Sequence, residues 1–422
     1  DLVLLNGGVY TVDEERSWAE AAAVRDGAFV AVGSNAEVES LVGPKTRVID
    51  LAGRMALPGF HDAHVHPTMG GYALLGCDLE GLASVAAIIE AVTACAQEMD
   101  EGWLEGHAFN LSLFGQDGPN KSLLDAVSMT RPIILWASDG HNAWANSTAL
   151  ELAGITAETP DPPLGVIERD PDGSPSGTLR ETAQELVRAA MPTPTLEGNV
   201  EALRAGITHL NSFGVTSFVD AWVGLEDYQS YQAVERAGDL DARVVTSLTY
   251  ESGFAKHYGD EFDQVLSGRN EFESERLNHD SVKLFLDGVL EGETAALVEP
   301  YVGMHGKQGE LILEPETLNA AVTRFDAMGL QVHMHAIGDR AVRSALRAIA
   351  GVTSGEPATN RHSIAHAQLI HPDDIARIAA LRIPVAFTYA WAVRDYWYDA
   401  TVIPFIDAID SLEDMYNPDS YY

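Results

Sequence analysis

The chain has 422 residues, and its 63 acidic residues outnumber its 26 Lys and Arg, which gives a net charge of −37 at pH 7. This charge argues against nucleic acid and anionic membranes as partners, because both are bound through basic patches. The acidic residues are dispersed and 46% of all residues are hydrophobic, so the chain is not a disordered acidic tail. Its length suits one large α/β barrel with a small companion domain, or two or three ordinary domains.

Two further features of the composition concern habitat and compartment. Lysine is rare, and acidic, lysine-poor proteins are typical of salt-loving microbes, where salt screens self-repulsion. No apolar run reaches the roughly 18 residues needed to cross a bilayer. The start at Asp1 lacks the basic segment of a signal peptide, although the missing initiator Met leaves a removed leader open. Cys77 and Cys95 are too few for a disulfide framework or a cysteine zinc site, which favours a reducing, cytoplasmic setting.

Residues 1–55 predict a small β domain. Short apolar runs alternate there with turn dipeptides such as Asn6-Gly7 and Asp26-Gly27, a pattern typical of β-hairpins.

Residues 56–422 predict a barrel of alternating strands and helices. After a first strand that leads into His64, six apolar runs occur at 217–220, 243–248, 282–287, 330–335, 363–366 and 383–388. So many repeats favour a TIM-type (β/α)8 barrel over an open sheet, although an eighth strand is not evident. Residues 70–210 break the rhythm and are expected to form a lid or side domain inserted after the first strand, with a loop or hairpin at 159–177.

Four histidines stand at or near the ends of predicted barrel strands. On a strand, His64 and His66 point to the same face, about 6–7 Å apart and within reach of one metal ion. A polar loop with chance histidines is the alternative for this pair alone. His335 and His366 each end a later strand, and the working residues of a TIM-type barrel lie at the C-terminal ends of its strands. Because neutral imidazole is a normal zinc ligand, this placement predicts a transition-metal site.

Lys283 lies inside an apolar strand of a chain that has only five lysines. Burying an unpaired ammonium is costly. One explanation is an ion pair with Asp287 or Glu291. The other is carbamylation by CO2, which turns the cation into a carboxylate able to bridge two metals.

These residues occur in the order found in the amidohydrolase superfamily. Residues 58–66, 282–288, 335–341 and 366–368 resemble its YtcJ-like branch, amidohydrolase family 3, as do residues 139–147 and 165–181 of the insertion. The resemblance implies that residues 1–55 belong to a β-sandwich beside the barrel. It also implies one or two divalent metals, zinc by preference, held by His64, His66, carbamylated Lys283, His335 and His366.

The sequence departs from this family at the eighth strand. Members usually carry there an Asp that binds metal and takes the proton from the attacking water. No such motif follows residue 388, and the C-terminal strands of the sandwich are not evident either. Either the chain continues beyond residue 422 or the protein lacks its base. The first is favoured, because a barrel without one strand has two unpaired edges.

Four acidic residues are weaker candidates for the site. Asp62 and Asp287 are expected to orient metal-binding histidines, with a plain loop carboxylate as the alternative for Asp62. Asp339 is assigned to catalysis together with Lys283 and His335, although Asp287 and Asp339 also stand where a residue caps the helix that follows. Glu181, in the insertion, is the weakest of the four.

Other ring-bearing candidates come from the insertion and one barrel strand. His141 and Trp144 are assigned to substrate binding, with a buried aromatic corner as the alternative. His333 shares the strand face of His335.

The function implied is hydrolysis of an amide-type C–N bond in a small molecule, such as an N-acyl or N-formyl compound. Ester, lactone or cyclic amide hydrolysis on the same scaffold is the alternative among enzymes, because barrel loops set the substrate. A non-catalytic binding or regulatory protein is the alternative from another class. Whether the chain forms a homo-oligomer is left open.

Overall fold

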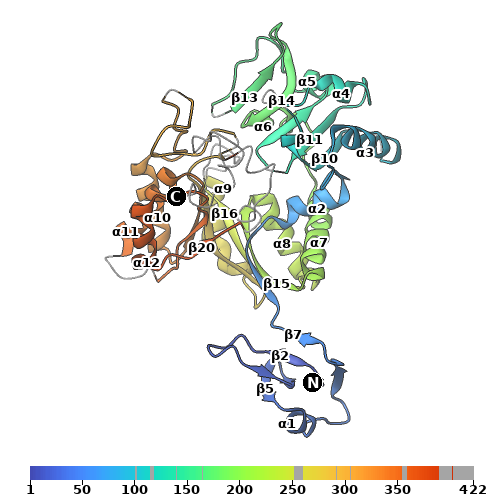
Figure 1. Ribbon diagram of the computed structural model, residues 1–422, viewed down its shortest axis with the longest axis vertical. Coiled ribbons are helices and arrows are strands. Elements are labelled where there is room, and N and C mark those ends of the chain that lie inside the picture. The colour runs from blue at the N-terminus through green and yellow to red at the C-terminus, as the bar shows by residue number, and fades with distance from the viewer. Residues whose placement is uncertain are drawn as a thin grey trace, which may run out of the picture. The chain divides into compact units, whose positions relative to one another are not determined.

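The computed structural model describes residues 1–99, 102–114, 118–138, 140–163, 165–250, 260–290, 292–304, 306–353, 359–388 and 402 (Figure 1). Its backbone contacts divide into two compact units. The first comprises Asp1–His61 with Gly214–Ser217, and the second Asp62–Phe213 with Phe218–Tyr422. Within the described ranges no helix is long and apolar enough to cross a membrane.

The first unit contains two small sheets. One has the strand order β5-β4-β1-β6 and the other β3-β2-β7. Their strands are β1 (Leu2–Leu5), β2 (Gly8–Tyr10), β3 (Trp18–Ala19), β4 (Ala21–Arg25), β5 (Ala28–Gly33), β6 (Arg47–Asp50) and β7 (Met55–Ala56). The short helix α1 (Asn35–Glu39) begins at a capping box made by Ser34 and Glu37. The β-sandwich implied for this region stays a prediction.

The second unit is built on a seven-stranded sheet whose spatial order follows the chain, β8-β15-β16-β17-β18-β19-β20. The strands are β8 (Phe60–Val65), β15 (Val215–Val223), β16 (Arg243–Thr249), β17 (Leu277–Phe285), β18 (Gln331–Ala336), β19 (Ser363–His366) and β20 (Val385–Ala386). Consecutive strands from β16 to β20 pair in parallel. The connecting helices include α8 (Leu225–Ala237), α9 (Asp260–Gly268), α10 (Pro315–Ala327), α11 (Asp339–Thr353) and α12 (Pro372–Leu381). This is the order of a TIM-type barrel, as predicted. The region in which an eighth strand was sought lies almost entirely outside the described residues.

The barrel core explains which side chains remain for chemistry. Val282 and Leu284 of β17 and Val332 and Met334 of β18 belong to a cluster with apolar residues of α10 and α11. Because side chains alternate along a strand, the residues that alternate with these apolar ones project from the opposite face of the sheet. These are Lys283, His333 and His335.

The insertion carries its own six-stranded sheet, ordered β13-β14-β12-β11-β10-β9. Its strands are β9 (Cys77–Asp78), β10 (Leu104–Phe109), β11 (Ile133–Ala137), β12 (Asn142–Ala145), β13 (Gly165–Arg169) and β14 (Pro175–Glu181). Strands β13 and β14 form an antiparallel hairpin within the Pro- and Gly-rich stretch 159–177 and just beyond it. The helices of this region are α2 (Pro67–Leu75), α3 (Val85–Glu98), α4 (Lys121–Asp125), α5 (Ser147–Leu152), α6 (Gln184–Arg188) and α7 (Leu196–Ser212). Short 3-10 turns lie at Leu111–Leu113 and Arg269–Phe272.

Helices α2 and α7 approach closely through glycine. A Cβ on Gly71 would lie 1.7 Å from the backbone oxygen of Ala202, and one on Gly206 would lie 2.1 Å from that of Pro67. Both obstacles are backbone atoms, so neither can rotate away. The packing matters for the site, because α2 begins directly at its N-cap, His66.

We expect Gly71→Ala to lower the free energy of unfolding by about 1–3 kcal/mol or more, since the new methyl group overpacks the contact with α7. The adjacent Gly70→Ala is the matched control: a Cβ there has no atom within 4 Å, and alanine favours the helix by up to about 1 kcal/mol. Urea unfolding of both variants checks this. Equal stability of the two would contradict the packing argument.

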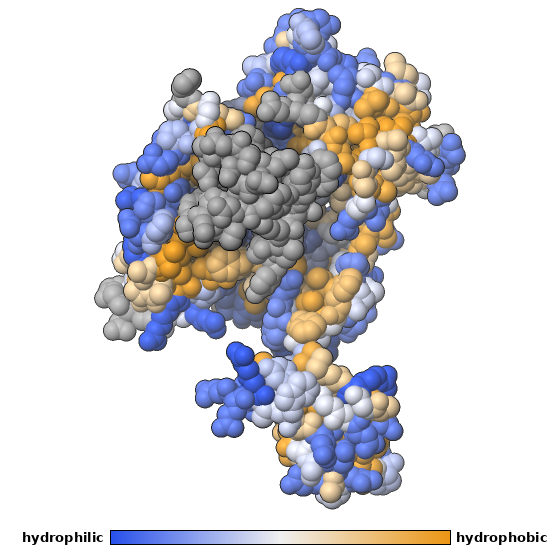
Figure 2. Space-filling view, viewed as in Figure 1, coloured by the Kyte–Doolittle hydropathy of each residue, from blue (hydrophilic) through white to orange (hydrophobic). Residues whose placement is uncertain are grey.

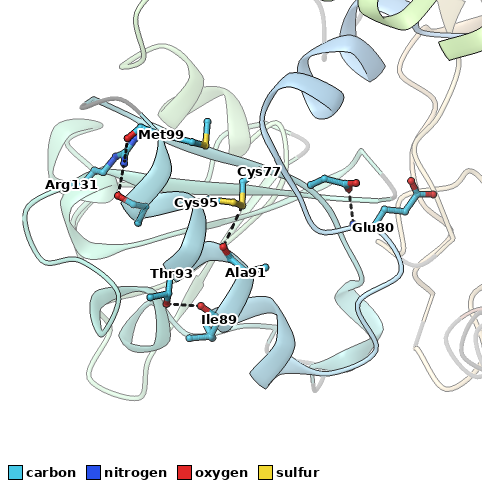
Figure 3. Close-up of a disulfide and its surroundings, with 10 residues drawn as sticks. Cys77, Glu80, Ile89, Ala91, Thr93, Cys95, Met99 and Arg131 are labelled. Carbon is cyan, nitrogen blue, oxygen red and sulfur yellow. Dashed lines mark hydrogen bonds between the residues drawn. A yellow bond between two sulfur atoms is a disulfide. The ribbon is translucent and has the colours of Figure 1, made fainter. Parts of the chain in front are cut away.

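Cys77 of β9 and Cys95 of α3 form a disulfide, with an S–S distance of 2.08 Å (Figure 3). The sulfur of Cys77 also lies 3.8 Å from the carbonyl oxygen of Ala91. Disulfides persist in oxidising compartments and are rare in reducing ones. The bond therefore counts against the reducing, cytoplasmic setting that the cysteine count favours.

Breaking this disulfide is expected to destabilise the insertion by about 3 kcal/mol, the chain-entropy value for a loop of this length, because the cysteines are 18 positions apart. Urea unfolding with and without a thiol reductant measures the effect. The reductant should not change the stability of a Cys77→Ala/Cys95→Ala variant. If it leaves the wild type unchanged as well, the bond is absent or contributes nothing.

Hydrophilic residues are spread over the visible surface of both units rather than gathered in one patch (Figure 2). With a net charge of −37, the folded chain repels itself, and salt screens that repulsion over a Debye length of about 10 Å at 0.1 M and 3 Å at 1 M. We therefore expect the melting temperature to rise between 0.1 and about 2 M KCl. A melting temperature that falls over this range would contradict the prediction of a salt-loving source.

Candidate metal centre

The predicted ligand residues lie near the C-terminal ends of four barrel strands. His64 is the penultimate residue of β8, and His66 follows that strand as the N-cap of α2. Lys283 lies two residues before the end of β17, His335 is penultimate in β18 and His366 ends β19. Parallel strands place these ends at one rim of the barrel, where barrel enzymes carry their working residues.

The imidazole rings of the four predicted ligand histidines lie close together. Ring centroids are 5.1 Å apart for His64 and His66, 4.5 Å for His64 and His366, and 4.8 Å for His335 and His366. The fold thus brings residues separated by some 300 positions into one continuous cluster.

His333 joins this cluster through hydrogen bonds. Its Nε2 lies 2.8 Å from Nδ1 of His64, and its Nδ1 lies 2.8 Å from the hydroxyl of Ser363. It pairs with Lys283 in the register of β17 and β18. His333 therefore holds the ring of His64 through this hydrogen bond. The sequence indicated only that His333 shares a strand face with His335.

The other rings are also held at one nitrogen. Nε2 of His335 lies 3.1 Å from the carbonyl oxygen of Gly288, and Nδ1 of His366 lies 2.9 Å from the hydroxyl of Thr388. His366 and Ala367 have positive φ angles of 72° and 44°. Residues other than glycine rarely adopt this backbone conformation, and such strain concentrates at functional sites.

Burial keeps most of these imidazoles neutral. It lowers the pKa values of His64, His333, His335 and His366 well below the ordinary value, and the nearby charge of Lys283 lowers them further. Neutral imidazole is the form that binds metal.

Lys283 is buried and forms no ion pair with the described residues. Burial lowers the pKa of its ammonium to about 7, although the charge of Asp220 opposes this shift. Its Nζ lies 4.8 Å from the ring centroid of Phe285. The predicted alternative of an ion pair with Asp287 is wrong, and Glu291 lies outside the described residues.

Asp287 instead binds backbone amides. Its carboxylate accepts hydrogen bonds from the N–H groups of Ala296, Ile337 and Gly338 at 2.8–2.9 Å. Burial nevertheless raises its pKa to about 7. One of its oxygens lies 3.7 Å from Nε2 of His335, so Asp287 fixes the loop after β18 and stands beside one predicted ligand.

The donor set has the chemistry of a metal site, but its present geometry is not that of a bound metal. Among the described residues, no three His, Cys, Asp or Glu side chains converge as they would around an ion. The ring nitrogens nevertheless leave room for one. Nε2 of His64 and Nδ1 of His335 form no hydrogen bond with the described residues. The chemistry of the residues present therefore fits a divalent metal.

Two other acidic candidates make backbone contacts. Asp62 accepts a hydrogen bond from the backbone N–H of His64 at 3.0 Å rather than from an imidazole. Asp339, the first residue of α11, accepts one from the N–H of Val298 at 2.8 Å. These contacts give both residues a structural role. The predicted role of Asp62 in orienting a histidine and that of Asp339 in catalysis rest on sequence alone.

The insertion brings one of its two ring-bearing candidates, His141, to the cluster. The rings of His141 and His335 are 6.2 Å apart, and Nδ1 of His141 lies 2.8 Å from the carboxylate of Glu181. Trp144 is fully buried and packs against Phe109 and Phe114 in the core of the insertion. Trp144 thus fits the alternative of a buried aromatic corner. It does not fit the assignment to substrate binding.

The sequence reasoning did not assign Asp220, a buried carboxylate of β15 that lies 3.8 Å from Nδ1 of His66. Nor did it assign Trp222, whose ring meets that of His66 edge to face at 5.9 Å. The sequence feature that could have indicated Asp220 is its position as an acidic residue at the end of the apolar run 217–220.

Comparison with known proteins identifies the family. The profile of the amidohydrolase family matches residues 47–411. The chain belongs to the amidohydrolase family. The predicted resemblance to its YtcJ-like branch is confirmed by the putative amidohydrolase YtcJ of Bacillus subtilis, which is 32% identical over 90% of this chain and 71% of that protein.

Two further relatives extend the comparison. An N-substituted formamide deformylase of Arthrobacter pascens is 28% identical over 91% of this amidohydrolase and 72% of its own length. The crystal structure of an uncharacterized metal-dependent hydrolase from Pyrococcus horikoshii superposes with a TM-score of 0.74, at 25% identity over 96% of this chain and 77% of that one. Family and fold together identify the protein as a hydrolase.

Proposed function

We propose that this amidohydrolase is a metal-dependent hydrolase of amide-type C–N bonds in small molecules, with N-formyl and N-acyl amines as the substrate class. The observation that carries the proposal is the gathering of His64, His66, His335 and His366 beside the buried Lys283 at the strand ends of the barrel. The similarity to a formamide deformylase supports the choice of bond.

In this proposal the four imidazoles and a carbamylated Lys283 hold one or two divalent ions, with zinc as the preferred metal. Such an ion, when bound, lowers the pKa of a coordinated water toward about 7 and polarises the scissile carbonyl. Lys283 suits carbamylation because it is buried and forms no ion pair with the described residues. A buried, unpaired cation is costly. Carbamylation replaces it by an anionic group whose charge a metal neutralises.

Residues around the imidazole cluster are proposed to position its loop and the substrate. Asp287 fixes the loop that follows His335 through three backbone hydrogen bonds. His141 reaches toward His335 from the insertion and is proposed to contact the substrate. The carboxylate that moves the proton to the leaving nitrogen is assigned to an eighth strand rather than to Asp339, whose side chain is bound to Val298.

The test is hydrolysis of a matched set of substrates by the zinc-loaded protein. N-formyl and N-acetyl benzylamine are compared with benzyl formate and with a lactam, each before and after removal of metal by a chelator. Faster turnover of the open-chain amides, lost on chelation and restored by zinc, supports the proposal. Preference for the ester or the lactam supports the alternative reaction on this scaffold. No turnover of any compound by metal-loaded protein favours a non-catalytic binding protein.

A further inference from the structure

Asp220 is a buried carboxylate beside two of the predicted metal ligands. It lies in β15, the barrel strand next to β8, and only 2% of its surface is exposed. One of its oxygens is 3.8 Å from Nδ1 of His66, and its charge also acts on Lys283. Burying a carboxylate is costly unless it is paired and hydrogen-bonded, so its position requires an explanation.

Two hydrogen bonds hold this carboxylate in place. Oδ2 accepts one from the hydroxyl of Tyr231 on α8 at 2.8 Å, and Oδ1 accepts one from the backbone N–H of Trp222 at 3.3 Å. Tyr231 is fully buried, so its hydroxyl has no competing contact with bulk water. The carboxylate is thus fixed on both oxygens, with Oδ1 turned toward His66.

His66 is the complementary half of the arrangement. Its Nδ1 is buried without a hydrogen-bond partner among the described residues. Leaving such a group unsatisfied carries the full cost of its desolvation. The 3.8 Å separation exceeds hydrogen-bond length, so the imidazole has to turn toward Oδ1 for the bond to form. The ring of Trp222, edge to face with that of His66 at 5.9 Å, limits other movements of the imidazole.

We propose that Asp220, braced by Tyr231, is the positioning residue of His66. Accepting a hydrogen bond from Nδ1–H fixes the tautomer that leaves Nε2 of His66 available to a metal. The inference rests on the proposed metal centre and adds to it a chain of three residues, Tyr231 to Asp220 to His66, that orients one ligand. A role only as counter-ion of the Lys283 ammonium is the competing explanation.

The experiment measures zinc affinity by chelator competition for Asp220→Asn, Tyr231→Phe, His66→Asn and the Asp220→Asn/His66→Asn double variant. Asp220→Asn should weaken zinc binding about 10- to 100-fold, and Tyr231→Phe should weaken it less. In the His66→Asn background, Asp220→Asn should have little further effect, because residues acting through one another are not additive. Tyr301→Phe is the control, since Tyr301 is also buried but donates to the carbonyl of Ala295.

The visible spectrum of the cobalt-substituted protein gives a second readout that a purely structural role would not move. Asp220→Asn and Tyr231→Phe should shift its bands, and Tyr301→Phe should leave them unchanged. Circular dichroism of the metal-free proteins verifies that each variant folds. Unchanged zinc affinity in Asp220→Asn, or effects of Asp220→Asn and His66→Asn that add in full, would overturn the inference while the metal centre stands. A wild-type protein that binds no divalent metal would instead overturn the proposed function.

Discussion

Replacing His64 with alanine is expected to abolish stable zinc binding and to lower kcat/KM by about a thousandfold or more. His64 is the centre of the imidazole cluster, with rings of His66, His333 and His366 at 5.1, 5.0 and 4.5 Å. The stabilisation that a metal gives to the transition state amounts to several kcal/mol, and each 1.36 kcal/mol corresponds to a tenfold change in rate.

The matched control for this variant is His209→Ala, because His209 is an exposed histidine of α7. Zinc content per chain and kcat/KM for an N-formyl amine are measured for both variants and the wild type. The control should match the wild type in both quantities. A His64→Ala protein that keeps its zinc and its activity would remove His64 from the metal centre.

Replacing Lys283 with methionine is the second substitution with a large expected effect. Methionine occupies a similar volume but cannot carry a carboxyl group, so kcat/KM should fall by about a hundredfold or more through the loss of a metal-bridging group. The folded protein should persist, because removing a buried amine relieves the cost of its desolvation. Lys307→Met is the control, since Lys307 is a half-exposed lysine paired with Glu293.

Carbamylation itself is measured by carbon NMR after incubation with labelled bicarbonate. The wild type and Lys307→Met should both give a slowly exchanging carbamate resonance, and Lys283→Met should give none. Bicarbonate should also raise the amount of zinc bound by the wild type but not by Lys283→Met. An unchanged resonance in the Lys283 variant would place the carbamate elsewhere, and its absence from the wild type would favour an unmodified lysine.

The barrel was predictable because each of its strands is visible in the sequence as a short apolar run. The apolar runs at 282–287 and 330–335 correspond to the ends of β17 and to β18 within a few residues, and histidines at strand ends identify the rim. Family resemblance then linked these short segments into one site. The order of the sheet follows the order of the chain, so no long-range pairing had to be inferred.

The insertion and the supporting contacts were less predictable because they depend on distant pairings. Strand β9 has two residues and pairs with β10 almost thirty positions later, and the disulfide joins Cys77 to a helix residue without a local signal. Asp287 stands next to the Lys283 strand in sequence, but its hydrogen bonds run to Ala296, Ile337 and Gly338. Asp220 was not predicted as a site residue, because acidic residues also follow apolar runs at ordinary strand ends and helix caps.

The metal content of the purified protein tests most directly whether the strand-end histidines and Lys283 form a metal centre. The full-length protein is dialysed free of adventitious ions, supplied with zinc and bicarbonate, and analysed by mass spectrometry of its metals together with the His64→Ala variant. We predict one or two tightly bound zinc ions per wild-type chain and fewer in the variant. A wild-type protein that retains no divalent metal under these conditions would contradict the account.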